Sequence, residues 1–160
     1  MEIDILIETP DWEAVDLPAL AQSAGDTTLA ELGLDPARHS LSILACDDAR
    51  IAILNTEFRG KPAPTNVLSW PAEDRASEAP GTAPSLDDLP VELGDLALAF
   101  QTCAREATDG NKPLADHVRH LVVHGLLHCL GYDHDDTADA ELMEGLETRI
   151  LARLGVADPY

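Results

Sequence analysis

Three histidines in the last third of the chain have the spacing of ligands for a single metal ion. His124 and His128 are four residues apart, so on a helix they project from the same face, one turn from each other. Gly131 lets the backbone leave the helix in a conformation that a larger residue resists. This reversal can return His134 to the same ion, so the spacing predicts a metal site carried by a helix.

Three neutral imidazoles favour zinc, although nickel, copper or iron would also accept them. A structural zinc ion normally has four protein ligands, and the sequence offers no obvious fourth. Zinc with an open position binds water and lowers its pKa to about 7. The chain is therefore predicted to be a hydrolase that binds one Zn2+ ion through His124, His128 and His134.

Two other interpretations of this segment are weaker. The spacing equals that of the metzincin proteases, H-E-x-x-H-x-x-G-x-x-H, in which the glutamate is the general base. Here Gly125 occupies that position, and losing a general base typically costs about 10²- to 10⁴-fold in rate, which disfavours a metalloprotease. Cys129 points about 100° away from His128 around a helix and is expected to be a buried small hydrophobic residue.

The composition fits one folded domain over residues 1 to 160, because 45% of the residues are hydrophobic and this length can bury a core. No apolar run approaches the roughly 18 residues that cross a bilayer, and Met1-Glu2-Ile3-Asp4 lacks the positive charge of a secretory signal. Three cysteines without paired spacing suit a reducing compartment. The expected location is the cytoplasm, with no membrane partner.

The charge balance is strongly acidic, with a net charge of -20. Such a chain attracts polyanions weakly. From composition alone, nucleic acid is a disfavoured partner. Any RNA binding should be modest and strongly sensitive to salt, because phosphates are neutralised by Lys and Arg.

The apolar pattern predicts strands at residues 2 to 8, 40 to 45, 66 to 70 and 93 to 100. It predicts helices over residues 47 to 58, 101 to 108 and 137 to 154, with the histidine helix opening at Lys112-Pro113. Two short helices interrupted at Gly25-Asp26 are expected within residues 11 to 34. Residues 71 to 90, rich in Pro, Ala, Glu and Asp, are expected to form a mobile loop without chemistry.

Three segments resemble the YbeY family of metal-dependent endoribonucleases. The run from His124 to His134, H-G-L-L-H-C-L-G-Y-D-H, is similar to the family motif H-G-x-L-H-L-x-G-Y-D-H, with Cys129 in place of the usual Leu. Residues 58 to 71 resemble a second block, with Trp70 where Phe is common, and Leu93-Gly94-Asp95 matches a third.

The resemblance implies a zincin-like α+β domain, in which helices pack a mixed four-stranded sheet. It implies zinc at His124, His128 and His134. It also implies a single-strand-specific endoribonuclease that acts in the maturation of 16S and other ribosomal RNA and in ribosome quality control. The expected partners are single-stranded or ribosomal RNA and the ribosome or its small subunit. The oligomeric state stays open.

Arg59 is the candidate catalytic residue outside the metal site. It lies beside Lys61 in a chain with ten basic residues, and a guanidinium can bind two phosphate oxygens at once. The resemblance implies the same role. The alternative is a solvent-facing cation that suits the end of a helix.

Several roles remain open in the sequence. Asp133 could orient a ligand histidine or cap a turn. Asp95 could line the cleft or belong to a turn, and His120 could border the pocket. A different function is also open, in which the metal only stabilises the fold of a non-enzymatic ribosome assembly factor.

Overall fold

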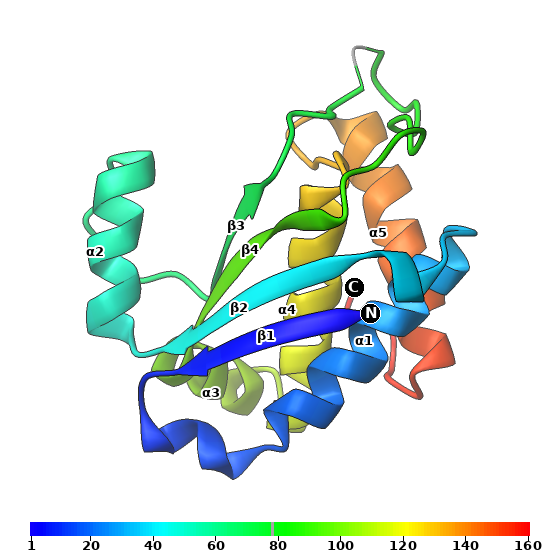
Figure 1. The fold of residues 1–160 in the computed structure, drawn as a ribbon. Coiled ribbons are helices and arrows are strands. Elements are labelled where there is room, and N and C mark those ends of the chain that lie inside the picture. The colour runs from blue at the N-terminus through cyan, green and yellow to red at the C-terminus, as the bar shows by residue number, and fades with distance from the viewer. Residues whose placement is uncertain (78) are drawn as a thin grey trace.

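The structure of the protein, a computed structural model, describes residues 1 to 77 and 79 to 160. Its centre is a four-stranded mixed sheet in the order β1-β2-β4-β3 (Figure 1). Three strands run parallel, and the edge strand β3 pairs with β4 antiparallel. The strands are β1 (Glu2–Ile7), β2 (Ser40–Cys46), β3 (Val67–Pro71) and β4 (Glu92–Ala99). The predicted α+β fold with a mixed four-stranded sheet is confirmed.

Five α-helices pack around this sheet within the described residues. They are α1 (Leu17–Glu31), α2 (Asp48–Arg59), α3 (Phe100–Asp109), α4 (Leu114–Cys129) and α5 (Thr137–Arg153). Short 3-10 turns lie at Pro10–Ala14 and Pro36–Arg38. Helix α2 stands apart from the other four (Figure 1). None of the helices so described has the length and apolarity needed to span a bilayer.

Alternate residues of β4 enter two separate hydrophobic clusters. Leu96 and Leu98 belong to the large core that includes residues of α1, α4 and α5. Ala97 and Ala99 instead pack with Ile51 of α2. Because side chains alternate between the two faces of a strand, α4 and α2 lie on opposite faces of the sheet. The histidine helix is therefore supported by the main core, and α2 by a small cluster.

Helix α1 is continuous, so the prediction of two short helices interrupted at Gly25-Asp26 was wrong. A Cβ atom at Gly25 would come within 2.9 Å of Met1 Sδ, so the glycine allows close contact with the start of the chain. Asp26 accepts a hydrogen bond from the Met1 amino group at 2.6 Å and another from Gln22 at 3.1 Å. These tertiary contacts offset the roughly 1 kcal/mol that glycine costs in a helix.

Helix α4 lies directly against the sheet and ends where the sequence predicted. A Cβ atom at Gly125 would be 2.7 Å from Leu96 Cδ2, so the glycine permits this close packing. The helix ends at Cys129, which is buried as expected. Gly131 then adopts a φ of 105°, a conformation that favours glycine, and reverses the chain toward His134.

The connection between β3 and β4 covers the predicted loop over residues 71 to 90, of which Glu78 lies outside the described residues. Arg75 links its two arms, because the guanidinium donates hydrogen bonds to the carbonyl of Ser85 at 3.3 Å and to that of Asp87. The mobility of this loop stays a prediction.

Candidate metal centre

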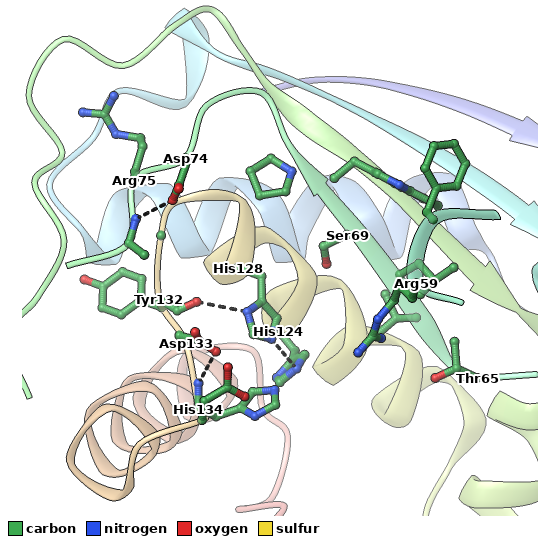
Figure 2. Close-up of a pocket in the computed structure, with 18 of the residues that line it drawn as sticks. Arg59, Thr65, Ser69, Asp74, Arg75, His124, His128, Tyr132, Asp133 and His134 are labelled. Atoms are coloured by element: carbon green, nitrogen blue, oxygen red, sulfur yellow. Dashed lines mark hydrogen bonds between the residues drawn. The ribbon is translucent and has the colours of Figure 1, made fainter. Parts of the chain in front are cut away.

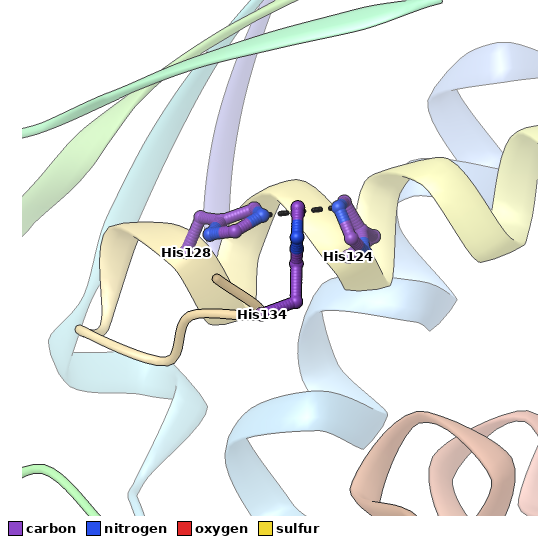
Figure 3. Close-up of side chains that lie close together, drawn as sticks. All are labelled: His124, His128 and His134. Carbon is purple, nitrogen blue, oxygen red and sulfur yellow. Dashed lines mark hydrogen bonds between the residues drawn. The ribbon is translucent and has the colours of Figure 1, made fainter. Parts of the chain in front are cut away.

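The three predicted histidines lie together. His124 and His128 project from the same face of α4, and His134 returns to them from the segment after the helix (Figure 3). One ring nitrogen of each residue lies within 4.8 Å of the other two. The ring centroid of His134 is 5.4 Å from that of His124 and 4.9 Å from that of His128. This set of nitrogen donors could hold a metal ion.

Hydrogen bonds behind two of the rings determine which nitrogens face each other. His124 Nδ1 is 2.6 Å from the Glu147 carboxylate, and His128 Nδ1 is 3.0 Å from the Tyr132 carbonyl oxygen. Both partners are acceptors, so each Nδ1 carries the proton. In the neutral rings the two Nε2 lone pairs then face each other at 3.0 Å. A cation between them would remove the repulsion that this arrangement creates.

The spacing of these nitrogens fits a zinc ion. Zinc–nitrogen bonds of about 2.0–2.1 Å at tetrahedral angles separate two ligand atoms by roughly 3.3 Å, so the Nε2 atoms need to move apart only slightly. Among the His, Cys, Asp and Glu residues that the structure describes, no fourth side chain joins this group. The residues therefore suit an ion with one coordination position left for water or substrate.

Glu147 belongs to the site although the sequence did not reveal it. Its side chain on α5 is fully buried and accepts hydrogen bonds from His124, from His120 at 2.9 Å and from the Tyr160 hydroxyl. Burial raises the pKa of this carboxyl, but the hydrogen bonds outweigh that effect and lower it to about 2. The ionised carboxylate therefore fixes the orientation of His124 and makes its free nitrogen more basic.

His128 is held neutral by its surroundings. Burial, followed by the charges of His124 and His134, lowers the pKa of His128 to about 4. The neutral imidazole is the form that binds a metal ion. His128 can therefore coordinate a cation at neutral pH without first losing a proton.

The histidines open into a pocket of about 640 Å³. Arg59 reaches into it from the end of α2, while Asp74 and Asp133 lie on another side (Figure 2). The loop after β3 contributes Asp74 and Arg75 to the lining, so it lies at the site, and the expectation that it carries no chemistry stays a prediction. The pocket thus has Arg59 near one end, and the Asp74 and Asp133 carboxylates with Arg75 near the other.

Within the part of the chain that the structure describes, Arg59 has no carboxylate partner, unlike most of the arginines. Among the described residues, salt bridges engage six others, namely Arg50, Arg75, Arg105, Arg119, Arg149 and Arg153. Arg59 is the last residue of α2, and Gly60 ends the helix with a φ of 66°. Its guanidinium is therefore available to bind an anion in the pocket.

Three residues whose roles the sequence left open now have defined positions. Asp133 accepts a hydrogen bond from the backbone N–H of His134 at 2.7 Å, which is a turn contact. Asp95 is exposed within β4 and is not among the residues that line the pocket. His120 borders a second pocket of about 400 Å³, beside Tyr160, and its hydrogen bond to Glu147 connects it to the histidine cluster.

The fold and the site together define a class of protein, an α+β domain that presents a histidine cluster suited to a metal ion in an open pocket. Comparison with known proteins identifies the family within that class. The chain matches the family described as Endoribonuclease YbeY over residues 4–155. The protein therefore belongs to the YbeY family, as the three sequence blocks indicated.

Proteins named Endoribonuclease YbeY are close relatives over the whole chain. The protein from Jannaschia sp. (strain CCS1) is 73% identical and covers 100% of both chains. That from Dinoroseobacter shibae is 62% identical and covers 99% of this chain and 90% of its own. The solution structure of TM1509 from Thermotoga maritima is 20% identical, with a TM-score of 0.56 over 98% of this chain and 97% of that one. This structural likeness supports the fold alone.

Proposed function

We propose that the protein is a zinc-dependent endoribonuclease that hydrolyses phosphodiester bonds of single-stranded RNA. The observation that carries the metal part is the 3.0 Å distance between His124 Nε2 and His128 Nε2 beside an open pocket, with both Nδ1 atoms bonded to oxygen acceptors. With His134 they would be the three ligands of one ion on α4, in a zincin-like domain over residues 1 to 160. Family membership supports RNA as the substrate.

The residues of the pocket have separate tasks in this proposal. When bound, zinc supplies Lewis acidity and activates water at neutral pH. Arg59 binds the non-bridging oxygens of the reacting phosphate, where negative charge grows during the reaction. Glu147 and the Tyr132 carbonyl hold the ligand rings in place beforehand. Asp74 and Asp133 repel phosphates, which directs the RNA backbone toward Arg59.

The biological setting follows from the family resemblance. We propose that the substrate is ribosomal RNA, including 16S RNA, and that the protein acts in its maturation and in ribosome quality control. The partner would be the ribosome or its small subunit, in the cytoplasm. The acidic surface, with a net charge of -20, makes a protein-assisted approach to RNA more favourable than binding to long naked RNA.

Metal analysis and a substrate panel together test the proposal. The purified protein should contain one zinc or similar transition-metal ion per chain. It should cut a single-stranded RNA, leave the matched duplex and the matched DNA intact, and leave casein intact. Protein without a stoichiometric metal, or metal-loaded protein that cuts casein but not RNA, would contradict the proposal. Metal-loaded protein that cuts nothing, with or without ribosomes, would favour a structural ion in an assembly factor.

A further inference from the structure

An exposed aromatic side chain lies at the rim of the same pocket. Phe58, in the last turn of α2, is 62% exposed. Its ring meets that of Trp70 on β3 edge to face, with centroids 5.4 Å apart and planes at 77°. Both rings line the pocket together with His124 and His128. The chain therefore holds an aromatic ring largely in solvent a short way from its histidine cluster.

A second aromatic pair in the molecule has nearly the same geometry but a different setting. Trp12 and Phe100 also meet edge to face, with centroids 5.3 Å apart at 84°. Trp12 is 1% exposed, and its indole N–H donates to the Cys46 carbonyl at 3.0 Å. Burial of apolar area accounts for that pair. It does not account for Phe58, most of whose surface stays in water.

The neighbours of Phe58 indicate what the ring could contact. Arg59 follows it directly and enters the pocket without a carboxylate partner in the described chain. A nucleotide offers the matching pair of groups, because it joins an anionic phosphate to a flat base that stacks on aromatic rings. Asp74 and Asp133 on another side of the pocket disfavour a path for the phosphates there.

We propose that Phe58 and Trp70 form a stacking subsite for an unpaired base of the RNA strand whose phosphate Arg59 binds. This inference rests on the proposed function. Trp70 holds the Phe58 ring in a fixed orientation, which lowers the entropy cost of stacking. In a duplex both faces of a base are covered by its neighbours, whereas an unpaired base can turn out onto a protein ring. The subsite is thus a physical source of preference for single strands.

Binding to a cleavage-resistant strand tests the subsite. The probe is a single-stranded 2′-O-methyl phosphorothioate oligonucleotide, titrated into the metal-loaded full chain. Phe58→Leu keeps an apolar side chain but removes the ring, and should weaken binding by roughly five- to a hundredfold, the range of one base–aromatic contact. Phe58→Trp should bind as tightly as the original protein. Ile53→Ala is the matched control, because Ile53 is 51% exposed on the same helix but lies outside the pocket.

Abasic substitutions in the probe give a first measurement on the original protein alone. Removing the base at one position should weaken binding to the original protein. The same change should have little further effect on Phe58→Leu, since the two changes remove one contact. Binding should also quench the fluorescence of Trp70, and this quenching should be lost in Trp70→Phe.

The outcomes separate this inference from the function on which it rests. The stacking subsite is overturned if every abasic probe binds like the intact strand and Phe58→Leu binds like the original protein. If the original protein still cuts RNA in that case, the nuclease function stands. If the original protein neither binds nor cuts single-stranded RNA, both fail together.

Discussion

The two walls of the pocket differ in how the rest of the protein supports their side chains. In the histidine wall, formed by His124, His128 and His134, the His124 ring donates to the Glu147 carboxylate and the His128 ring to the Tyr132 carbonyl, while the exposed His134 is held through its backbone N–H by the Asp133 side chain. The α2 wall, formed by Phe58 and Arg59, ends a helix that packs on the small cluster of the opposite sheet face. The ligand rings of the first wall are held by hydrogen bonds, whereas in the second wall Phe58 is largely exposed and Arg59 has no carboxylate partner among the described residues.

The difference matches what each wall has to bind. A metal ion requires donor atoms within a few tenths of an ångström of fixed distances, so its ligands benefit from a rigid shell. An RNA strand brings phosphate charge and flat bases, so the wall that binds it needs a guanidinium without a carboxylate partner and an aromatic ring with an exposed face. Changes in the histidine wall should therefore alter metal content, whereas changes in the α2 wall should alter RNA cleavage with the metal retained.

Among changes to the histidine wall, His128→Ala should have the largest effect on metal content and cleavage. It removes one of three ligands, so the bound metal should be lost and cleavage should fall by on the order of 10³-fold or more, given that a metal contributes several kcal/mol to such reactions. Atomic absorption measures the metal, and circular dichroism measures folding. A variant that unfolds would indicate a structural ion instead, and full activity would exclude His128 as a ligand.

Arg59→Ala breaks the α2 wall alone. Removal of one preorganised donor to a developing anion typically lowers the rate about 10²- to 10³-fold. Cleavage of single-stranded RNA should fall by about that amount while zinc content is unchanged. The control is Arg38→Ala, because Arg38 is exposed in a turn outside the pocket. If the two variants cleave RNA at equal rates, Arg59 has no role in the mechanism.

Glu147→Gln weakens the support behind the histidine wall without touching a ligand. Such partners of metal-binding histidines typically contribute about 10- to 100-fold in affinity, so the variant should release zinc to a chelator at correspondingly lower concentration. Competition with a fluorescent zinc indicator measures this loss. Glu141→Gln on the exposed side of α5 should leave the affinity unchanged, and a similar loss there would point to a general charge effect.

Acidification should loosen the histidine wall in the metal-free protein. The pKa of His128 is about 4 in the folded chain, below its ordinary 6.5, so between these values the unfolded chain binds a proton that the folded chain does not. Stability should therefore fall as the pH drops from 6.5 to 4. Thermal melts should show a Tm that declines over this window, and His128→Gln should flatten the decline. A Tm independent of pH in both proteins would contradict the assignment.

Local patterns of the sequence predicted much of this arrangement. The four-residue spacing of His124 and His128 and the glycine at position 131 depend only on helix geometry and chain reversal. The predicted start of a helix at residue 47 likewise depends on a local contact, because the Asp47 side chain accepts a hydrogen bond from the N–H of Arg50. Each of these features is encoded within a few residues, so the structure reproduces them.

The features that the sequence did not reveal depend on contacts between distant segments. Glu147 is 23 residues from His124. In the sequence it is one of several acidic residues in an amphipathic helix, and its contact with His124 exists only because α5 packs on α4. Gly25 was predicted to interrupt the helix because the sequence does not show that it packs against Met1, which precedes β1. The pocket role of Arg75 likewise depends on how a proline-rich loop folds back over Gly131.

The close contact between Gly125 and Leu96 makes any larger residue at position 125 costly to accommodate. A glutamate at position 125 would complete the protease motif by sequence, yet its Cβ alone would overlap Leu96 and approach Ser69 Oγ at 3.3 Å. Either the buried Leu96 side chain would have to shift, or the helix would have to move away from β4 together with its two imidazoles. Completing the protease motif at position 125 would therefore disturb the packing against β4 of the helix that carries His124 and His128.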